Sequence, residues 1–283
     1  MKYTPKVPAE GVNAPRRSPL REFFVLSGGL LAVTLLVYAA LGLAVDHVVQ
    51  RLPAGIEQRL GAMYGSMYAG TEDARTGEGI QQILDGLVAV QPRGGGTGYR
   101  VHVVRDARIN ALALPGGRIV LFSGLLDVVG SENELAFVLA HELGHFAHRD
   151  HLRGLGRRLV MLAMVTPVFG RDSSVSRFIY TSLMDVEMKF SQRQEEAADL
   201  WAVDLLNARY GHAGGAVGFL ETMAAKERRG RSAYFFSTHP HPLRRVKVLK
   251  EYIMERGYAV GEEVPIEGFP TACGDDEQQG GSK

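Results

Sequence analysis

Residues 131–147 read SENELAFVLAHELGHFA, and this stretch decides the fold of the chain. Ser131 and Glu134 match the S-x-x-E capping box, which marks the start of a helix. Apolar residues then recur at helical spacing as far as Phe146. We therefore predict an amphipathic helix that carries the sequence His-Glu-Leu-Gly-His at 141–145 in its later turns.

The H-E-x-x-H pattern predicts a metal site on this helix. His141 and His145 are four residues apart, so their imidazoles share one helical face and can bind one ion. Zinc suits nitrogen and carboxylate ligands, and Glu142 is placed to act as general base on a water at the metal. Two solvated surface histidines are the alternative, but an unligated cluster among apolar neighbours would be costly.

A third ligand is expected from the acidic stretch FSQRQEEAAD at 190–199. Glu195 and Asp199 share a helical face, so one can bind the metal while the other accepts a hydrogen bond from a ligand histidine. Spacing alone does not choose Glu195 over Glu196. A solvated acidic face is an equal alternative at this point.

These motifs together resemble peptidase family M48, and specifically a single-span, membrane-anchored bacterial member. The resemblance covers about residues 55–255 and rests on four segments in the family's order: N-A-x-x-x-P-G-G at 110–117, E-L-x-x-V-x-A-H-E-x-x-H at 134–145, S-x-x-x-E-x-x-A-D at 191–199, and T-H-P-x-x-x-x-R at 238–245. One departure is Gln192, which stands where many members have arginine.

The resemblance implies one zinc ion per chain, with Glu195 as its third ligand and Asp199 as the carboxylate behind a ligand histidine. It also places His239 and Arg245 near the cleft, as catalytic residues. His239 either steadies the tetrahedral intermediate or caps the zinc in a latent state, and a structural salt bridge is an equal alternative for Arg245. The implied fold class is α+β: a mostly helical zincin-like domain with a small, mostly antiparallel sheet.

The N-terminal part of the chain predicts a membrane anchor. Residues 23–45, from Phe23 to Val45, are uncharged and apolar, and as a helix they would reach roughly 34 Å, enough for a bilayer core. A buried helix and a cleaved signal peptide are the alternatives. Lys and Arg are more frequent before this segment than after it, so we expect the peptidase domain on the periplasmic or extracellular side, with the reverse orientation as the alternative.

The remaining chain follows a simple plan. We predict a basic disordered flank at 1–21, a transmembrane helix at 22–46, the M48-like peptidase domain at 47–265 and a disordered tail at 266–283. Strands are expected at 99–104 and 117–122, with helices from there to about residue 257. The apolar run at 159–170 is too short to cross a bilayer, so a core helix is the first interpretation and a segment that dips into the membrane the second.

Composition excludes some functions and leaves others open. The 32 Lys and Arg balance 31 Asp and Glu, so nothing favours nucleic acid as a partner. The single cysteine, Cys273, cannot form an internal disulfide. His148, His151 and His241 are interpreted as surface histidines rather than ligands.

We therefore expect a zinc-dependent metalloendopeptidase that hydrolyses polypeptides, in protein quality control of unfolded or misfolded envelope proteins. A strand at 117–122 that edges the cleft would pair with an extended substrate backbone and read few side chains. A prenyl-protein protease is a weaker alternative, because that branch has many membrane helices and this chain has one clear span. A non-catalytic module with a structural zinc, closed by His239 as fourth ligand, is a further alternative, although such a site has no need of Glu142.

Overall fold

The computed structural model describes residues 18–65, 74–92, 98–184, 190–227, 233–240 and 242–266. Three predictions fall outside these ranges: the disordered flank before residue 18, the tail after residue 266 with Cys273, and the surface position of His241.

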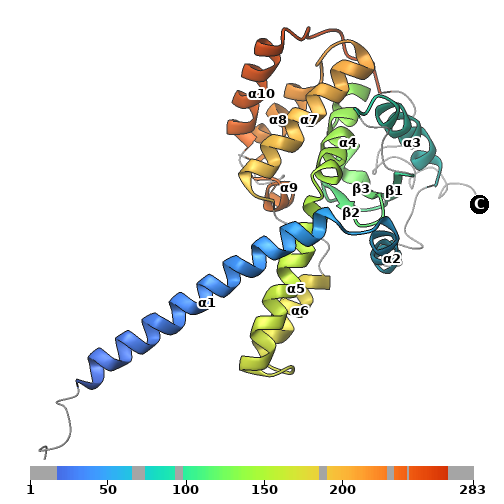
Figure 1. The fold of residues 1–283 in the computed structure, drawn as a ribbon. Helices are drawn as coiled ribbons and strands as arrows, with labels where there is room; N and C mark the ends of the chain where they lie inside the picture. Colours follow the sequence, from blue (N-terminus) through green and yellow to red (C-terminus); the bar gives the residue numbers. More distant parts are fainter. Residues whose placement is uncertain are drawn as a thin grey trace, which may run out of the picture.

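The first helix, α1 (Pro19–Gln50), projects away from the rest of the molecule (Figure 1). It is 32 residues long, and by length and composition it can cross a membrane. Val49, near its C-terminal end, is its buried residue, while the side chains from Leu20 to Leu36 are exposed. The alternative of a buried core helix is therefore wrong for this segment.

The sheet has three strands in the order β1-β3-β2: β1 (Arg100–Val104), β2 (Ala111–Leu114) and β3 (Arg118–Phe122). The two predicted strands are confirmed, and β2 was not predicted. All four residues of β2 are buried, and a strand covered on both faces lacks the alternation by which strands are recognised. Gly116 and Gly117 have φ angles of 81° and 74°, a backbone that favours glycine, and they turn the chain from β2 into β3.

The sheet differs from the prediction in two respects. It is mixed rather than mostly antiparallel, because β1 pairs with β3 in parallel while β2 pairs with β3 antiparallel. The prediction that residues 117–122 edge a cleft is wrong, since β3 lies between its two neighbours. The edges of this sheet are β1 and β2.

The predicted zinc-motif helix is confirmed as α4 (Glu132–Ala147), which lies at the centre of the fold (Figure 1). The Ser131 hydroxyl accepts a hydrogen bond from the Glu134 N–H at 3.1 Å, as the capping box requires. The Glu134 carboxylate instead accepts from the Gly130 N–H, at 2.6 Å, so the box is only half formed. Every residue from Asn133 to Phe146 is buried.

The next two helices form a hairpin, α5 (Asp150–Phe169) and α6 (Ser174–Met184), that projects from the body on the same side as α1 (Figure 1). The first interpretation of residues 159–170 as a core helix is wrong, because Leu159 is 51% exposed and Phe169 is 58% exposed. An apolar run of this length has the same composition in a core and outside it, so its surroundings could not be read from the sequence.

The corner between α4 and α5 also holds the end of α1. Arg149 has a left-handed backbone, with φ of 55°, and turns the chain between the two helices. Its guanidinium donates hydrogen bonds to the Val49 carbonyl at 2.6 Å and the Leu52 carbonyl at 3.2 Å. The Arg149 side chain thus connects the last turn of α1 to the corner that follows the zinc-motif helix.

The remaining helices complete the body around α4. They are α2 (Ala54–Gly65), α3 (Ala74–Ala89), α7 (Gln192–Tyr210), α8 (Ala216–Glu227), α9 (Ala233–Thr238) and α10 (Pro242–Arg256). Helix α3 covers the sheet next to β1, whereas α7, α8 and α10 pack together on the other side of α4 (Figure 1). The α+β class, with a mostly helical body and a small sheet, is therefore confirmed.

Candidate metal centre

The site forms where α4 and α7 pack closely against each other. Gly144 makes this approach possible, because a Cβ atom at this position would lie 2.8 Å from the Ala198 Cα atom. Helix α7 begins beside the zinc motif, where the Ser191 N–H donates to Gln194 Oε1 at 3.0 Å. The first turns of α7 therefore present their acidic residues to the histidines of α4.

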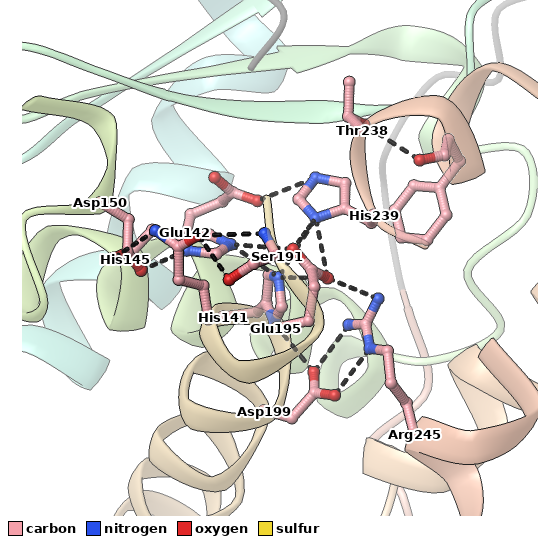
Figure 2. Close-up of polar contacts among 12 residues, drawn as sticks. His141, Glu142, His145, Asp150, Ser191, Glu195, Asp199, Thr238, His239 and Arg245 are labelled. Carbon is pink, nitrogen blue, oxygen red and sulfur yellow. Dashed lines mark hydrogen bonds and ion pairs between the residues drawn. The ribbon is translucent and has the colours of Figure 1, made fainter. Parts of the chain in front are cut away.

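Four buried side chains meet at one point: His141, His145, Glu195 and His239, whose candidate ligand atoms all lie within 4.8 Å of one another (Figure 2). The Nε2 atoms of His141 and His145 are 3.1 Å apart, and His141 Nε2 is 3.3 Å from His239 Nδ1. The nearest Glu195 oxygens lie 3.5 Å from His145 Nε2 and 3.6 Å from His141 Nε2.

These separations are close to those expected of ligand atoms around one zinc ion. Zinc bonds of about 2.0–2.1 Å to nitrogen and oxygen place neighbouring ligand atoms about 3.3 Å apart. The distance from His239 Nδ1 to Glu195 Oε1, 3.1 Å, matches this edge as well. The three expected ligands and His239 therefore lie close enough together to hold one ion between them.

Behind this cluster, Asp199 and Arg245 hold two of its members in place (Figure 2). His141 Nδ1 donates to Asp199 Oδ1 at 2.9 Å, which leaves Nε2 directed at the centre of the cluster. Arg245 donates two hydrogen bonds of 2.7 Å to Asp199 and pairs with Glu195 Oε2 at 2.7 Å. Since Arg245 is only 1% exposed, its contacts in the structure are those of a buried ion-pair network.

Two residues that the sequence did not single out support His145 from the other side. The Asp150 carboxylate lies 3.1 Å from His145 Nδ1, and its second oxygen accepts from Gln194 Nε2 at 2.7 Å. Burial on its own would lower the pKa of His145, but hydrogen bonds to Asp150 and Glu195 raise it to about 9. A more basic imidazole is a stronger metal ligand. The only sequence signal was an acidic residue five positions after His145.

Charge and burial in the site favour an ionised Glu195 carboxylate beside a neutral His141 imidazole. Burial alone would raise the pKa of Glu195, but the charges of His239 and Arg245 outweigh burial and hold it well below its usual value. Burial lowers the pKa of His141, although Asp199 acts against this. These are the protonation states in which carboxylate and imidazole bind a metal ion.

Glu142 lies beside the cluster with part of its side chain unsatisfied. It is 1% exposed, and its Oε1 atom is 3.8 Å from His239 Nε2. Among the described residues, its Oε2 atom has no hydrogen-bond partner. A buried carboxylate oxygen without a partner is costly in a purely structural role and is available to accept a proton.

The remaining candidates lie outside the cluster. Glu196, which spacing could not separate from Glu195, pairs with Arg244 at 3.0 Å and accepts from Gln192 at 2.9 Å, so neither it nor Gln192 touches the four clustered residues. His151 is not a surface residue as predicted: it is buried and hydrogen-bonds to Glu57 at 3.1 Å. The His148 ring packs edge-on against Trp201 and is not part of the cluster.

Comparison with known proteins gives one consistent result. The profile of Peptidase family M48 matches residues 74–253. The metalloprotease LoiP of Escherichia coli is 30% identical over 237 residues, which covers 82% of this chain and 90% of LoiP. Metalloprotease YcaL of E. coli is 30% identical over 160 residues, 55% of this chain and 61% of YcaL.

The mitochondrial metalloendopeptidase OMA1 of Schizosaccharomyces pombe is 28% identical over 178 residues, 62% of this chain and 52% of OMA1. The alignments thus span less than two thirds of OMA1 and YcaL but most of LoiP.

Proposed function

The chain belongs to peptidase family M48, and from this premise we propose that it is a membrane-anchored zinc endopeptidase whose metal is held by His141, His145 and Glu195. The observation that carries this proposal is the buried cluster of nitrogen and oxygen ligand atoms within 4.8 Å of one another. When bound, zinc supplies Lewis acidity, which polarises the scissile carbonyl and acidifies water.

Glu142 is the general base in this proposal. Its free Oε2 atom takes the proton from the attacking water and later delivers it to the leaving amine. Asp199 and Asp150 each hold one histidine in the tautomer whose Nε2 faces the cluster. Arg245 positions Asp199 and Glu195 and does not itself touch the reacting atoms.

His239 has two states in this proposal. In the structure its Nδ1 atom is 3.1 Å from Glu195 Oε1 and 3.3 Å from His141 Nε2, where it could be a fourth ligand, which supports a latent, closed site. When His239 leaves this position, substrate can enter and the imidazole can donate a hydrogen bond to the developing oxyanion. The same geometry favours the second candidate, a structural zinc with four ligands, which the unpaired oxygen of Glu142 argues against.

We propose that substrates are unfolded or misfolded polypeptides, bound as an extended strand beside β2, an edge strand of the sheet. Asn110, just before β2, has its Oδ1 atom 3.5 Å from the Thr238 hydroxyl, so this edge begins next to the segment that carries His239. Main-chain pairing tolerates many sequences. Cleavage of denatured proteins followed by mass spectrometry should give a broad set of sites, and one tight consensus would contradict this proposal.

We further propose that α1 crosses the membrane once, with the peptidase domain on the periplasmic or extracellular side. The exposed apolar length of α1 supports a span, and the basic residues before it support this orientation. A periplasm-active reporter fused to the C-terminus should be active, whereas activity of a cytoplasm-active reporter at the same position would reverse the orientation.

The experiment that tests the activity is zinc-dependent cleavage of casein by the full chain in detergent micelles. Glu142→Gln should lower kcat/KM by about 10²–10⁴-fold while it still binds one zinc ion. Glu196→Gln is the matched control, because this neighbour of Glu195 lies outside the cluster. If neither the wild type nor the control cleaves although zinc is bound, and His239→Ala does not release activity, the structural-zinc candidate replaces the peptidase.

A further inference from the structure

The α5–α6 hairpin carries apolar side chains that nothing in the described structure covers. They occur on both helices: Leu159, Met161, Val168 and Phe169 on α5, and Phe178 and Tyr180 on α6, each between 43% and 73% exposed. Only Ser176 and Ile179 are buried among the described side chains of α6, where it packs against α5. Large exposed apolar patches mark contact with a membrane or a partner.

The base of the hairpin is continuous with the end of α1. A Cβ atom on Gly156 would lie 2.6 Å from Val45 Cγ1, so the two helices touch where the apolar segment of α1 ends. Asp46 then pairs with Arg157 at 3.3 Å and with Arg153 at 3.7 Å. From this junction, α1 and the hairpin project from the same side of the body (Figure 1).

We propose that the α5–α6 hairpin lies in the headgroup region of the leaflet from which α1 emerges, with its apolar side chains inserted among the acyl chains. This inference rests on the proposed membrane span of α1. It gives the peptidase domain a second membrane contact, which begins at the end of the zinc-motif helix α4.

Two threonine hydroxyl groups on the hairpin bond to the helix's own carbonyls, which is compatible with a lipid environment. Thr166 donates to the Leu162 carbonyl at 2.7 Å, and Thr181 donates to the Arg177 carbonyl at 3.0 Å. Thr34 in α1 makes the same bond to the carbonyl four residues earlier, at 2.9 Å. Such internal bonds hide polar groups where no water is available.

Charge on the hairpin indicates an interfacial position rather than a second span. The apolar stretch of α5 from Leu159 to Phe169 is about 16 Å long, roughly half of a bilayer core. Arginines stand at both ends of this stretch, with Arg157 and Arg158 before it and the exposed Arg171 after it. An exposed arginine such as Arg171 reaches anionic headgroups while the apolar face beside it stays in the acyl region.

The test uses the full chain, inserted in vesicles of phosphatidylcholine and phosphatidylglycerol that contain a spin-labelled quencher lipid. Cys273→Ser removes the only cysteine, so a fluorophore can be placed at one introduced cysteine at a time. Phe178→Cys reports on the hairpin, Leu35→Cys on α1, and Met254→Cys, 75% exposed on α10, on the body. Val168→Cys repeats the hairpin measurement on the other helix.

We expect the lipid quencher to reduce the fluorescence of probes at positions 35, 178 and 168 but not at position 254. When lipids with the spin label at different depths are compared, the two hairpin probes should be quenched best by the label nearest the headgroup. Quenching at Leu35 without quenching at either hairpin site overturns this inference and leaves the span intact. No quenching at Leu35 refutes the span itself. If Phe178 fluorescence responds to protein density and not to quencher lipid, the hairpin is instead an interface with a second copy of the chain, and the inference fails.

Discussion

Two consecutive helices, α4 and α5, differ in which side chains they bury. Helix α4 buries charged and polar side chains, whereas α5 exposes large apolar ones. Helix α4 buries His141, Glu142 and His145, each no more than 4% exposed, whereas α5 leaves Leu159 and Phe169 more than half exposed. Buried charge is tolerated in α4 because carboxylates and imidazoles pair with each other. Both departures from ordinary burial point to function: chemistry in α4, and contact with another phase in α5.

The largest effect on folding is expected where the buried network behind α4 is broken. Asp199→Ala removes the partner of Arg245 and leaves a buried guanidinium without its bidentate acceptor, which should cost about 3–5 kcal/mol of stability. Thermal or denaturant unfolding of the full chain in detergent micelles measures this loss.

Glu196→Ala provides the control on the same helix. Its partner Arg244 has a side chain that is 62% exposed, so the loss should stay below about 1 kcal/mol. Equal losses in the two variants would mean that the network around Asp199 does not differ in strength from a surface ion pair.

The same substitution in both helices tests the comparison directly. Leu139→Ala in α4 removes a side chain that is 0% exposed and should destabilise the fold by about 2–5 kcal/mol. Leu159→Ala in α5 should change stability by no more than about 0.5 kcal/mol in detergent. Unfolding midpoints of the two variants give the answer, and a large loss at Leu159 would show that α5 belongs to the core.

The close approach of α7 to α4 is tested at Gly144. Gly144→Ala places a methyl group 2.8 Å from the Ala198 Cα atom, and the helices must separate, at a cost of about 1–3 kcal/mol. Zinc affinity should fall with stability, because Glu195 moves away with α7. Gly77→Ala in α3 meets nothing within 4 Å and should stabilise the chain by about 0.5–1 kcal/mol.

At Asp150 we expect the smallest effect on folding stability but a clear effect on zinc affinity. Asp150→Asn can keep an acceptor for Gln194 while it loses the negative charge beside His145 Nδ1. Zinc affinity, measured by competition with a chelator, should fall by about 10–100-fold with the unfolding midpoint nearly unchanged. Asp172→Asn, in the exposed turn of the hairpin, should leave zinc affinity unchanged. A similar loss of affinity in this variant would show that the effect of Asp150→Asn is not specific to the metal centre.

The sequence predicted those parts of the structure that local patterns determine. The cap at Ser131 and the helical periodicity located α4, and the uncharged apolar run located α1. Strand β2 was missed because four buried residues carry no alternation. The exposure of α5 was also missed, because an apolar helix has the same composition whether it faces a core or a lipid.

Prediction of the candidate site from the sequence was limited in the same way. The residues of the two helical motifs and His239 could be named from spacing and resemblance, and the structure brings them together. Asp150 and Gln194 could not be named, because their contact depends on the left-handed backbone of Arg149, which turns the chain from α4 into α5. Long-range pairing through an irregular corner leaves no periodic signal in the sequence.

Arg149 also has a consequence for which peptide bonds can be cut. The Arg149 guanidinium donates hydrogen bonds to carbonyls at the end of α1, and His151 hydrogen-bonds to Glu57 just beyond. The peptidase body is therefore held against the end of α1 by side-chain contacts as well as by the chain itself. With α1 in a membrane as proposed, this junction would hold the metal centre at a fixed height above the bilayer. Peptide bonds at that height would then be cut in preference to those nearer the lipid surface.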